Sequence, residues 1–243
     1  MVAALATWEP VILPSPDTLE TDIRAAGFLP LGHFVACPGG ETGERRMLLV
    51  GSAGEAFARR FKESPERTDR LGHPLDRWTR RVLGNIAMAH GSRVIFPFEG
   101  PPWHPFQQWA RLVDPRFHPS PTGLLVHPVY GLWIGLRGAF LLDTAPENAV
   151  DVTEQSESPC MSCIDQPCLT ACPVDAFDPV HGYDATACRS HLASDDTRTC
   201  VEGGCLARHA CPHGHAFRPP PSMARLHMRA FARLPQQEDD GEN

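Results

Sequence analysis

The sequence predicts an α+β protein in which a sheet-and-helix domain is followed by a small cysteine-rich module. Two observations carry this prediction. Apolar runs of strand length alternate with helical patterns up to about residue 145, and eight of the nine cysteines lie between Cys160 and Cys211. The 243 residues therefore divide into residues 1–150, residues 151–220, and a terminal helix with an acidic tail over residues 221–243.

The apolar runs predict the elements of the first domain in order. Strands are expected over residues 28–36, 47–50, 94–98, 124–126 and 132–142. The clearest helix covers residues 73–90, where one apolar face repeats at helical spacing, Pro74 stands in the first turn and Gly91 follows the end. Ser52 and Glu55 have the spacing of a capping box ahead of another helix.

The run at residues 132–142 has two different faces if it alternates as a strand. One face is a continuous core face, formed by Leu132, Ile134, Leu136, Phe140 and Leu142. The other face carries Trp133, Gly135, Arg137, Ala139 and Leu141. Small residues beside a tryptophan and an arginine leave space either for a ligand or for a packed helix, and the pattern alone favours neither.

Composition excludes several classes of partner. The net charge is −7, and Lys62 is the one lysine, so no basic stripe for a nucleic-acid backbone is present and no nucleic-acid partner is expected. No apolar run approaches the roughly 18 residues of a spanning helix, and the first ten residues do not resemble a secretory signal. A cytoplasmic protein without a membrane partner is expected.

The first cysteine group reads Cys160-x2-Cys163-x4-Cys168-x3-Cys172-Pro173. Bacterial ferredoxins use C-x2-C-x2-C-x3-C-P, in which the fourth cysteine binds the other of two clusters. The middle spacing here is longer by two residues, and the ending is the same. In a reducing compartment, clustered cysteines favour metal ligation over disulfides. This group therefore predicts a [4Fe–4S] cluster.

The second group is looser and consists of Cys188 and the run Cys200-x4-Cys205-x5-Cys211-Pro212. Sharing between the groups predicts two [4Fe–4S] clusters that use all eight cysteines. One would be held by Cys160, Cys163, Cys168 and Cys211, and the other by Cys172, Cys188, Cys200 and Cys205. Structural zinc is the alternative metal, and a histidine ligand from the nearby His209, His213 or His215 is an alternative donor.

A last helix is expected after the proline run that ends at Pro221. Ser222 would cap it, Met223, Leu226, Ala230 and Leu234 would face inward, and Arg225, Arg229 and Arg233 would form the opposite face.

The segment from Gly123 to Leu142 contains His127-Pro-Val-Tyr130-Gly131-Leu-Trp133. It resembles the His-Pro-x-aromatic-Gly-x-Trp segment of cblC-type cobalamin-processing proteins. It is also similar to the corresponding stretch of epoxyqueuosine reductases, which carry a two-cluster module directly after it. The resemblance implies a flavin-reductase or nitroreductase-like α+β fold that holds a corrinoid. Carried over by position, the corrinoid-binding residues would be His127, Tyr130, Gly131, Trp133, Gly135 and Arg137.

The resemblance also implies a function. The expected activity is reduction of a corrinoid (cobalamin), with removal of its upper-axial ligand, by electrons that a redox partner protein supplies through the clusters. Three alternatives remain open. The chain could be a ferredoxin-type carrier that serves a partner enzyme, a cobalamin-dependent reductase of an organic substrate, or a protein that holds a flavin in place of the corrinoid. His127 could equally serve only to fix the turn before Pro128.

Overall fold

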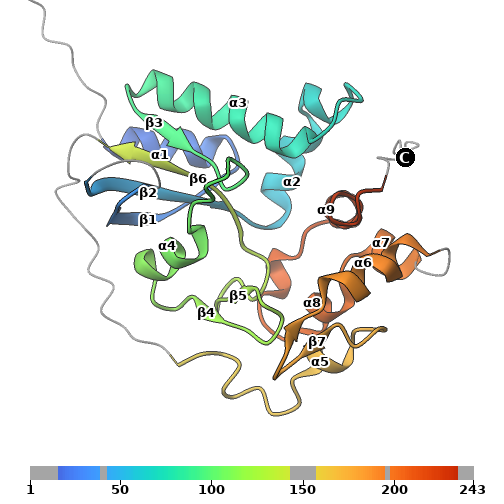
Figure 1. The fold of residues 1–243 in the computed structure, drawn as a ribbon. Coiled ribbons are helices and arrows are strands. Elements are labelled where there is room, and N and C mark those ends of the chain that lie inside the picture. Colours follow the sequence, from blue (N-terminus) through green and yellow to red (C-terminus); the bar gives the residue numbers. More distant parts are fainter. Residues whose placement is uncertain (1–15, 39–42, 143–156, 195–197, 235–243) are drawn as a thin grey trace, which may run out of the picture.

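The computed structural model describes residues 16–38, 43–142, 157–194 and 198–234. Over these residues the chain combines helices with small antiparallel sheets, which confirms the mixed class (Figure 1). The acidic tail from residue 236, and all but the last two residues of the polar segment 146–158, lie outside the described residues. In the part of the chain that is described, no helix has the length and apolar character needed to cross a membrane.

A four-stranded antiparallel sheet forms the centre of the first part of the chain, in the order β1–β2–β6–β3 (Figure 1). The strands are β1 Leu29–Ala36, β2 Arg45–Ser52, β3 Arg93–Ile95 and β6 Gly135–Leu142. The strands predicted at residues 28–36 and 47–50 are therefore confirmed to within a few residues. The strand predicted at 132–142 begins later, because residues 127–133 form a turn.

Helices cover both faces of this sheet (Figure 1). They are α1 Pro16–Ala25, α2 Gly54–Lys62, α3 Pro74–Ala89 and α4 Phe106–Val113. The first three enclose one core around Trp78 and Phe140, and α4 closes a second core around Met47 and Trp109. Burial on both faces removes apolar surface from water on each side, and this is the main source of the sheet's stability.

A β-bulge in β6 reverses the predicted alternation of its side chains. Val50 pairs with Gly138 and Gly51 pairs with Leu136, so Arg137 is the extra residue. Leu136 consequently packs with the core under α4, while Phe140 packs with the core under α3. The prediction of one continuous core face and one open face is wrong, since a one-residue shift moves every later side chain to the other face.

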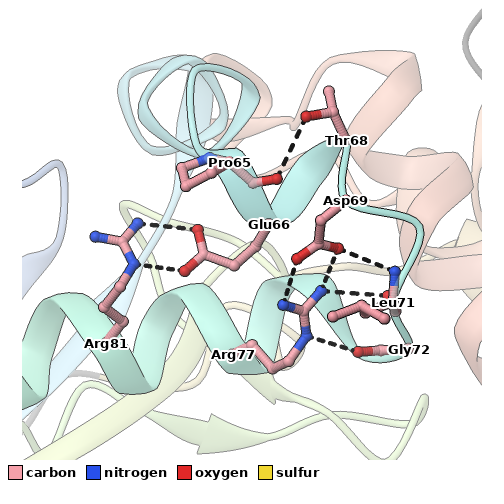
Figure 2. Close-up of polar contacts among 8 residues, drawn as sticks. All are labelled: Pro65, Glu66, Thr68, Asp69, Leu71, Gly72, Arg77 and Arg81. Carbon is pink, nitrogen blue, oxygen red and sulfur yellow. Dashed lines mark hydrogen bonds and ion pairs between the residues drawn. The ribbon is translucent and has the colours of Figure 1, made fainter.

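A short loop before α3 is held by two arginine–carboxylate pairs (Figure 2). Arg77 donates to both carboxylate oxygens of Asp69 at 2.6 Å, and Arg81 donates to Glu66, which lies in the short 3-10 helix Pro65–Arg67. Bidentate pairs of this kind fix geometry as well as adding energy. The arginine side chains of α3 therefore determine how the chain enters that helix.

The cysteine-rich part is built from short helices and a small hairpin (Figure 1). They are α5 Pro167–Thr170, β7 Phe177–Asp178, β8 Gly182–Tyr183, α6 Ala185–Ala193, α7 Arg198–Gly203, α8 Leu206–Ala210 and the 3-10 helix His215–Phe217. The small hairpin of β4 His118–Pro119 and β5 Leu125–Val126 leads from the sheet toward them.

The terminal helix α9 (Pro221–Ala232) joins the two parts of the protein. Its Met223 and Leu226 complete the core under α3, whereas Met228 and Phe231 pack with the core of the cysteine-rich part. Two details of the prediction are wrong. Ser222 does not cap the helix, which begins after Pro220, and Arg229 is buried while Ala230 is exposed. Packing on two sides leaves this helix no uniform solvent face.

Candidate functional site

The first set of cysteines lines one cavity between the cysteine-rich part and the β4–β5 hairpin. Its thiols belong to Cys160, Cys163, Cys168 and Cys211. Val126 and Leu132, which flank the His127 turn, form the apolar wall of this cavity. The fourth member therefore comes from the second cysteine group of the sequence, as the sharing rule predicts.

Local backbone geometry brings the first set together. The amide of Cys163 donates to the carbonyl of Cys160 at 3.3 Å, which closes a turn. Gln166 then adopts a left-handed conformation (φ 37°) as the cap of α5, with Pro167 in its first turn. The two extra residues of this loop thus build the start of α5, which carries Cys168. Cys211 directly follows α8, and α8 packs on α5.

The second set forms around the ends of four short helices. Its thiols, which interact with one another electrostatically, belong to Cys172, Cys188, Cys200 and Cys205. Cys172 follows α5, Cys188 lies in α6, Cys200 lies in α7, and Cys205 caps α8. Asp184 begins α6 by accepting hydrogen bonds from two backbone amides at 2.9 Å, and this positions Cys188 in the next turn.

Burial raises the pKa of five thiols, namely Cys160, Cys168, Cys188, Cys200 and Cys211. Repulsion from neighbouring thiols of the same set raises the pKa further, because adjacent thiolates disfavour each other. Thiols bind metals as thiolates, so a cationic centre would reverse this balance. Within the described ranges, no three His, Cys, Asp or Glu side chains lie close enough to hold a single metal ion.

Two groups hydrogen-bond to sulfurs of the second set. The backbone amide of Ala176 donates to Sγ of Cys172 at 3.4 Å. The hydroxyl of Tyr183 pairs with the thiol of Cys188, and this contact lowers the pKa that burial raises. Donors of this kind stabilise negative charge on sulfur. No sequence pattern indicates Tyr183, because the contact depends on how the β7–β8 hairpin folds against α6.

His127 is fully buried and uses both ring nitrogens inside the protein. Its Nε2 lies 3.2 Å from Oδ2 of Asp114, and its Nδ1 accepts from the backbone amides of Val129 and Tyr130. Burial lowers the pKa of His127, although the Asp114 carboxylate opposes this effect. These contacts match the role of a histidine that fixes the turn before Pro128.

Tyr130 and Gly131 contact the cysteine-rich part. The ring of Tyr130 packs edge-on against Phe217, with 4.8 Å between centroids. A Cβ atom on Gly131 would lie 2.2 Å from the carbonyl oxygen of His213. The small residue in this motif therefore permits a close approach of two backbones.

Trp133, Gly135 and Arg137 lie where the sheet meets α8 and α9. The Trp133 ring is covered by the Arg208 guanidinium at 4.6 Å, and it meets His209 edge-on at 4.9 Å. A Cβ on Gly135 would lie 3.1 Å from the Ser52 hydroxyl, which accepts a hydrogen bond from Nε of Arg137 at 2.8 Å. Ser52 thus binds Arg137 and does not cap α2, which begins after Ala53 with no side-chain cap.

The six residues expected to bind a corrinoid are therefore all found in or beside the segment that joins the sheet to the cysteines. Whether they hold a corrinoid stays a prediction. Sequence reasoning missed Arg208 and His227, which approach Arg137 from α8 and α9. The sequence carries no distinct signal for either residue, because other basic residues lie in the same short helices.

A scan against known protein-family models finds no match, and a search of curated proteins finds no similar sequence.

Proposed function

We propose that the protein is an iron–sulfur redox protein that holds two [4Fe–4S] clusters. The first cluster would be bound by Cys160, Cys163, Cys168 and Cys211, and the second by Cys172, Cys188, Cys200 and Cys205. The single observation that carries this proposal is that the chain folds its eight clustered cysteines into two sets of four, each completed by a cysteine from the other group. The ninth, Cys37, is exposed and takes no part.

The distance between thiols distinguishes clusters from zinc. Four thiolates on one tetrahedral zinc ion, with Zn–S bonds of about 2.3 Å, would bring their sulfurs to within about 3.8 Å of each other. In a cubane cluster each thiolate binds its own iron at a different corner, so the sulfurs are further apart. Among the described residues no trio of His, Cys, Asp or Glu side chains is placed for a single ion, and the preference for clusters rests on the cysteine spacing of the sequence.

Clusters of this kind would supply one-electron transfer at low potential. The chain surrounds the first set with apolar side chains of the sheet domain, Val126 and Leu132. It links the second set to the sheet through Arg208, which interacts with Cys205, stacks on Trp133 and donates to the Leu132 carbonyl at 2.6 Å. The first set thus borders the segment around His127, and the second set is connected to that segment through Arg208.

The finer fold belongs to the same proposal. We assign residues 1–150 to a flavin-reductase or nitroreductase-like domain and residues 151–220 to a ferredoxin-like module. A sheet covered by helices on both faces, followed by short helices around two cysteine sets, supports this assignment. The helix α9 packs on both parts and would fix the distance between them.

The electron acceptor that we propose is a corrinoid, cobalamin, which the protein would reduce with removal of its upper-axial ligand. A redox partner protein would supply the electrons. The resemblance of the His127–Trp133 segment supports this choice, as does Arg208, which connects Trp133 to Cys205 of the second cysteine set. A cobalamin-dependent reductase of an organic substrate, or a flavin in the same place, would use the same residues.

One observation favours a different function, that of an electron carrier for a partner enzyme. Tyr130, Gly131 and the face of Trp133 are covered by residues 208–217 of the cysteine-rich part. In this arrangement they join the two parts of the protein and do not need a ligand to explain them.

The test is an anaerobic purification followed by a cobalamin titration. Iron and acid-labile sulfide are each expected at about eight per chain. Cobalamin binding should give a base-off absorption spectrum, and Gly135→Val should weaken it without loss of iron. The matched control is Gly84→Val, because a Cβ on Gly84 meets no atom within 4 Å. Stoichiometric zinc without sulfide would exclude the clusters, and full iron with no cobalamin binding would favour the electron carrier.

A further inference from the structure

Three basic side chains from three separate elements meet between the sheet and α8. Arg137 projects from the bulge of β6, Arg208 from α8 and His227 from α9. They are close enough that both arginines lower the pKa of His227, and Arg208 opposes the protonated state of Arg137. The only carboxylate that acts on Arg137 among the described residues is Asp76, whose own pKa is raised by burial.

These three groups form a cationic cluster that protein encloses on most sides. Burial is the first cause of the lowered pKa of each group. Each residue nevertheless keeps part of its surface accessible to solvent. An anion bound to this cluster would be attracted more strongly than at an open surface, because the surrounding protein excludes much of the water.

Two polar groups of this cluster and its surroundings are donors without acceptors. Nε of Arg208 and Nε1 of Trp133 are both buried and have no hydrogen-bond partner within the described structure, and Trp133 is only 6% exposed. A buried donor without a partner destabilises the protein. Two such donors on stacked side chains, beside a second arginine, indicate that an acceptor is expected there.

We propose that Arg137, Arg208 and Trp133 form a binding site for one oxyanion, a phosphate or carboxylate group of a small molecule. A guanidinium presents paired donors that match these groups, and its strength rises where water is largely excluded. Two local features position the Arg137 side chain, namely the bulge of β6 and the hydrogen bond to Ser52. Bulges commonly redirect a side chain in this way next to functional sites.

This site deepens the proposed function in one respect, which rests on that proposal. Arg208 interacts with Cys205, so an anion held by Arg208 would lie beside the second cysteine set. The molecule that receives or delivers electrons there would then be anionic. Oxyanion binding itself depends only on the arginines and the tryptophan, and it can be measured independently of the clusters.

The test is a calorimetric titration of the full-length protein with inorganic phosphate, and separately with malonate, at constant ionic strength. Saturable binding of either anion is expected. Binding of phosphate alone would assign a phosphate ester, and binding of malonate alone a carboxylate. Arg137→Gln and Arg208→Gln should each weaken binding about tenfold or more, since hydrogen bonds to charged groups are the strong ones. Trp133→Phe keeps the ring, removes only the N–H donor, and should weaken binding less.

The matched control is Arg80→Gln. Arg80 also pairs with a carboxylate, that of Glu99, but its side chain is 54% exposed, so this substitution should leave anion binding unchanged. Iron content, measured in parallel, should stay at the parent level in Arg137→Gln. If neither anion binds the parent protein, or if folded Arg137→Gln and Arg208→Gln bind as well as Arg80→Gln, the site is excluded. Anion binding without iron would leave this site intact and overturn only the clusters.

Discussion

The backbones of Gly131 and His213 touch, and this contact joins the sheet domain to the cysteine-rich part. A Cβ on Gly131 would lie 2.2 Å from the His213 carbonyl oxygen, and one on Gly214 would lie 2.2 Å from the carbonyl oxygen of Tyr130. Both glycines also have positive φ angles, 57° and 72°. Each part of the protein thus contributes one glycine, and neither position accepts a side chain without movement of the other backbone.

We therefore expect Gly131→Ala to destabilise the protein by about 1–3 kcal/mol or more, because a strained backbone conformation and a backbone clash act together. The measurement is the midpoint of urea unfolding. Gly123→Ala is the matched control, since Gly123 has a similar φ of 74° but its Cβ would meet only Tyr183, at 4.0 Å. Equal losses in the two variants would show that the contact with His213 contributes nothing.

Sharing of cysteines between the groups gives a second prediction. Cys172→Ala should damage the cluster of Cys188, Cys200 and Cys205, and Cys211→Ala should damage the other. Each variant should keep about four irons, with one intact cluster visible by electron paramagnetic resonance. Cys37→Ala, which alters an exposed cysteine outside both sets, should keep the full iron content. If Cys172→Ala instead damages the cluster of Cys160, Cys163 and Cys168, the sharing is wrong.

The hydroxyl of Tyr183 provides a third prediction. It pairs with the thiol of Cys188, and a hydrogen bond to a cluster sulfur favours the more negative, reduced state. Tyr183→Phe should therefore shift the reduction potential of one cluster to a more negative value, while the ring keeps its stacking on Phe177 at 4.9 Å. Tyr130→Phe is the control, because Tyr130 packs on Phe217 and His127. A potential that moves equally in both variants would remove the role of the Tyr183 hydroxyl.

Local patterns of the sequence were sufficient for several features. The helix predicted over residues 73–90 is α3, Pro74–Ala89, since its apolar spacing and the Pro74 and Gly91 signals all act within the helix itself. The meeting of Cys160, Cys163 and Cys168 also follows from spacing, because one short loop carries all three. Both predictions depend on interactions between residues near each other along the chain.

Features that depend on distant contacts were missed. The bulge at Arg137 arises from the pairing of β6 with Val50 and Gly51 of β2, and alternation within residues 132–142 contains no trace of it. Ser52 has the spacing of a helix cap, but its hydroxyl accepts a hydrogen bond from Arg137, which the bulge places beside it. Arg208 and His227 reach the same place only because α8 and α9 pack there. The cluster of Arg137, Arg208 and His227 is thus a product of tertiary structure.

The last prediction concerns the pH dependence of stability, in which His227 has a defined part. Burial, followed by repulsion from Arg137 and Arg208, lowers the pKa of His227 to about 3, from about 6.5 in an unfolded chain. Below pH 6.5 the unfolded state therefore binds a proton on the His227 side chain that the folded state does not bind. The contribution of neutral His227 to the free energy of unfolding is fully present above pH 6.5. It is lost as the pH falls toward 3, by up to about 1.4 kcal/mol per pH unit.

Urea unfolding of the parent protein should accordingly show a falling free energy between pH 7 and pH 5. His227→Gln, which cannot be protonated, should reduce this slope. Some slope should remain, since burial also lowers the pKa of His127 and His209. His181→Gln is the control, because the His181 side chain is 85% exposed beside Asp178, and its loss should leave the slope as it is. If His227→Gln has the same slope as His181→Gln, then His227 accepts a proton in the folded protein and its surroundings are more open to water than its burial implies.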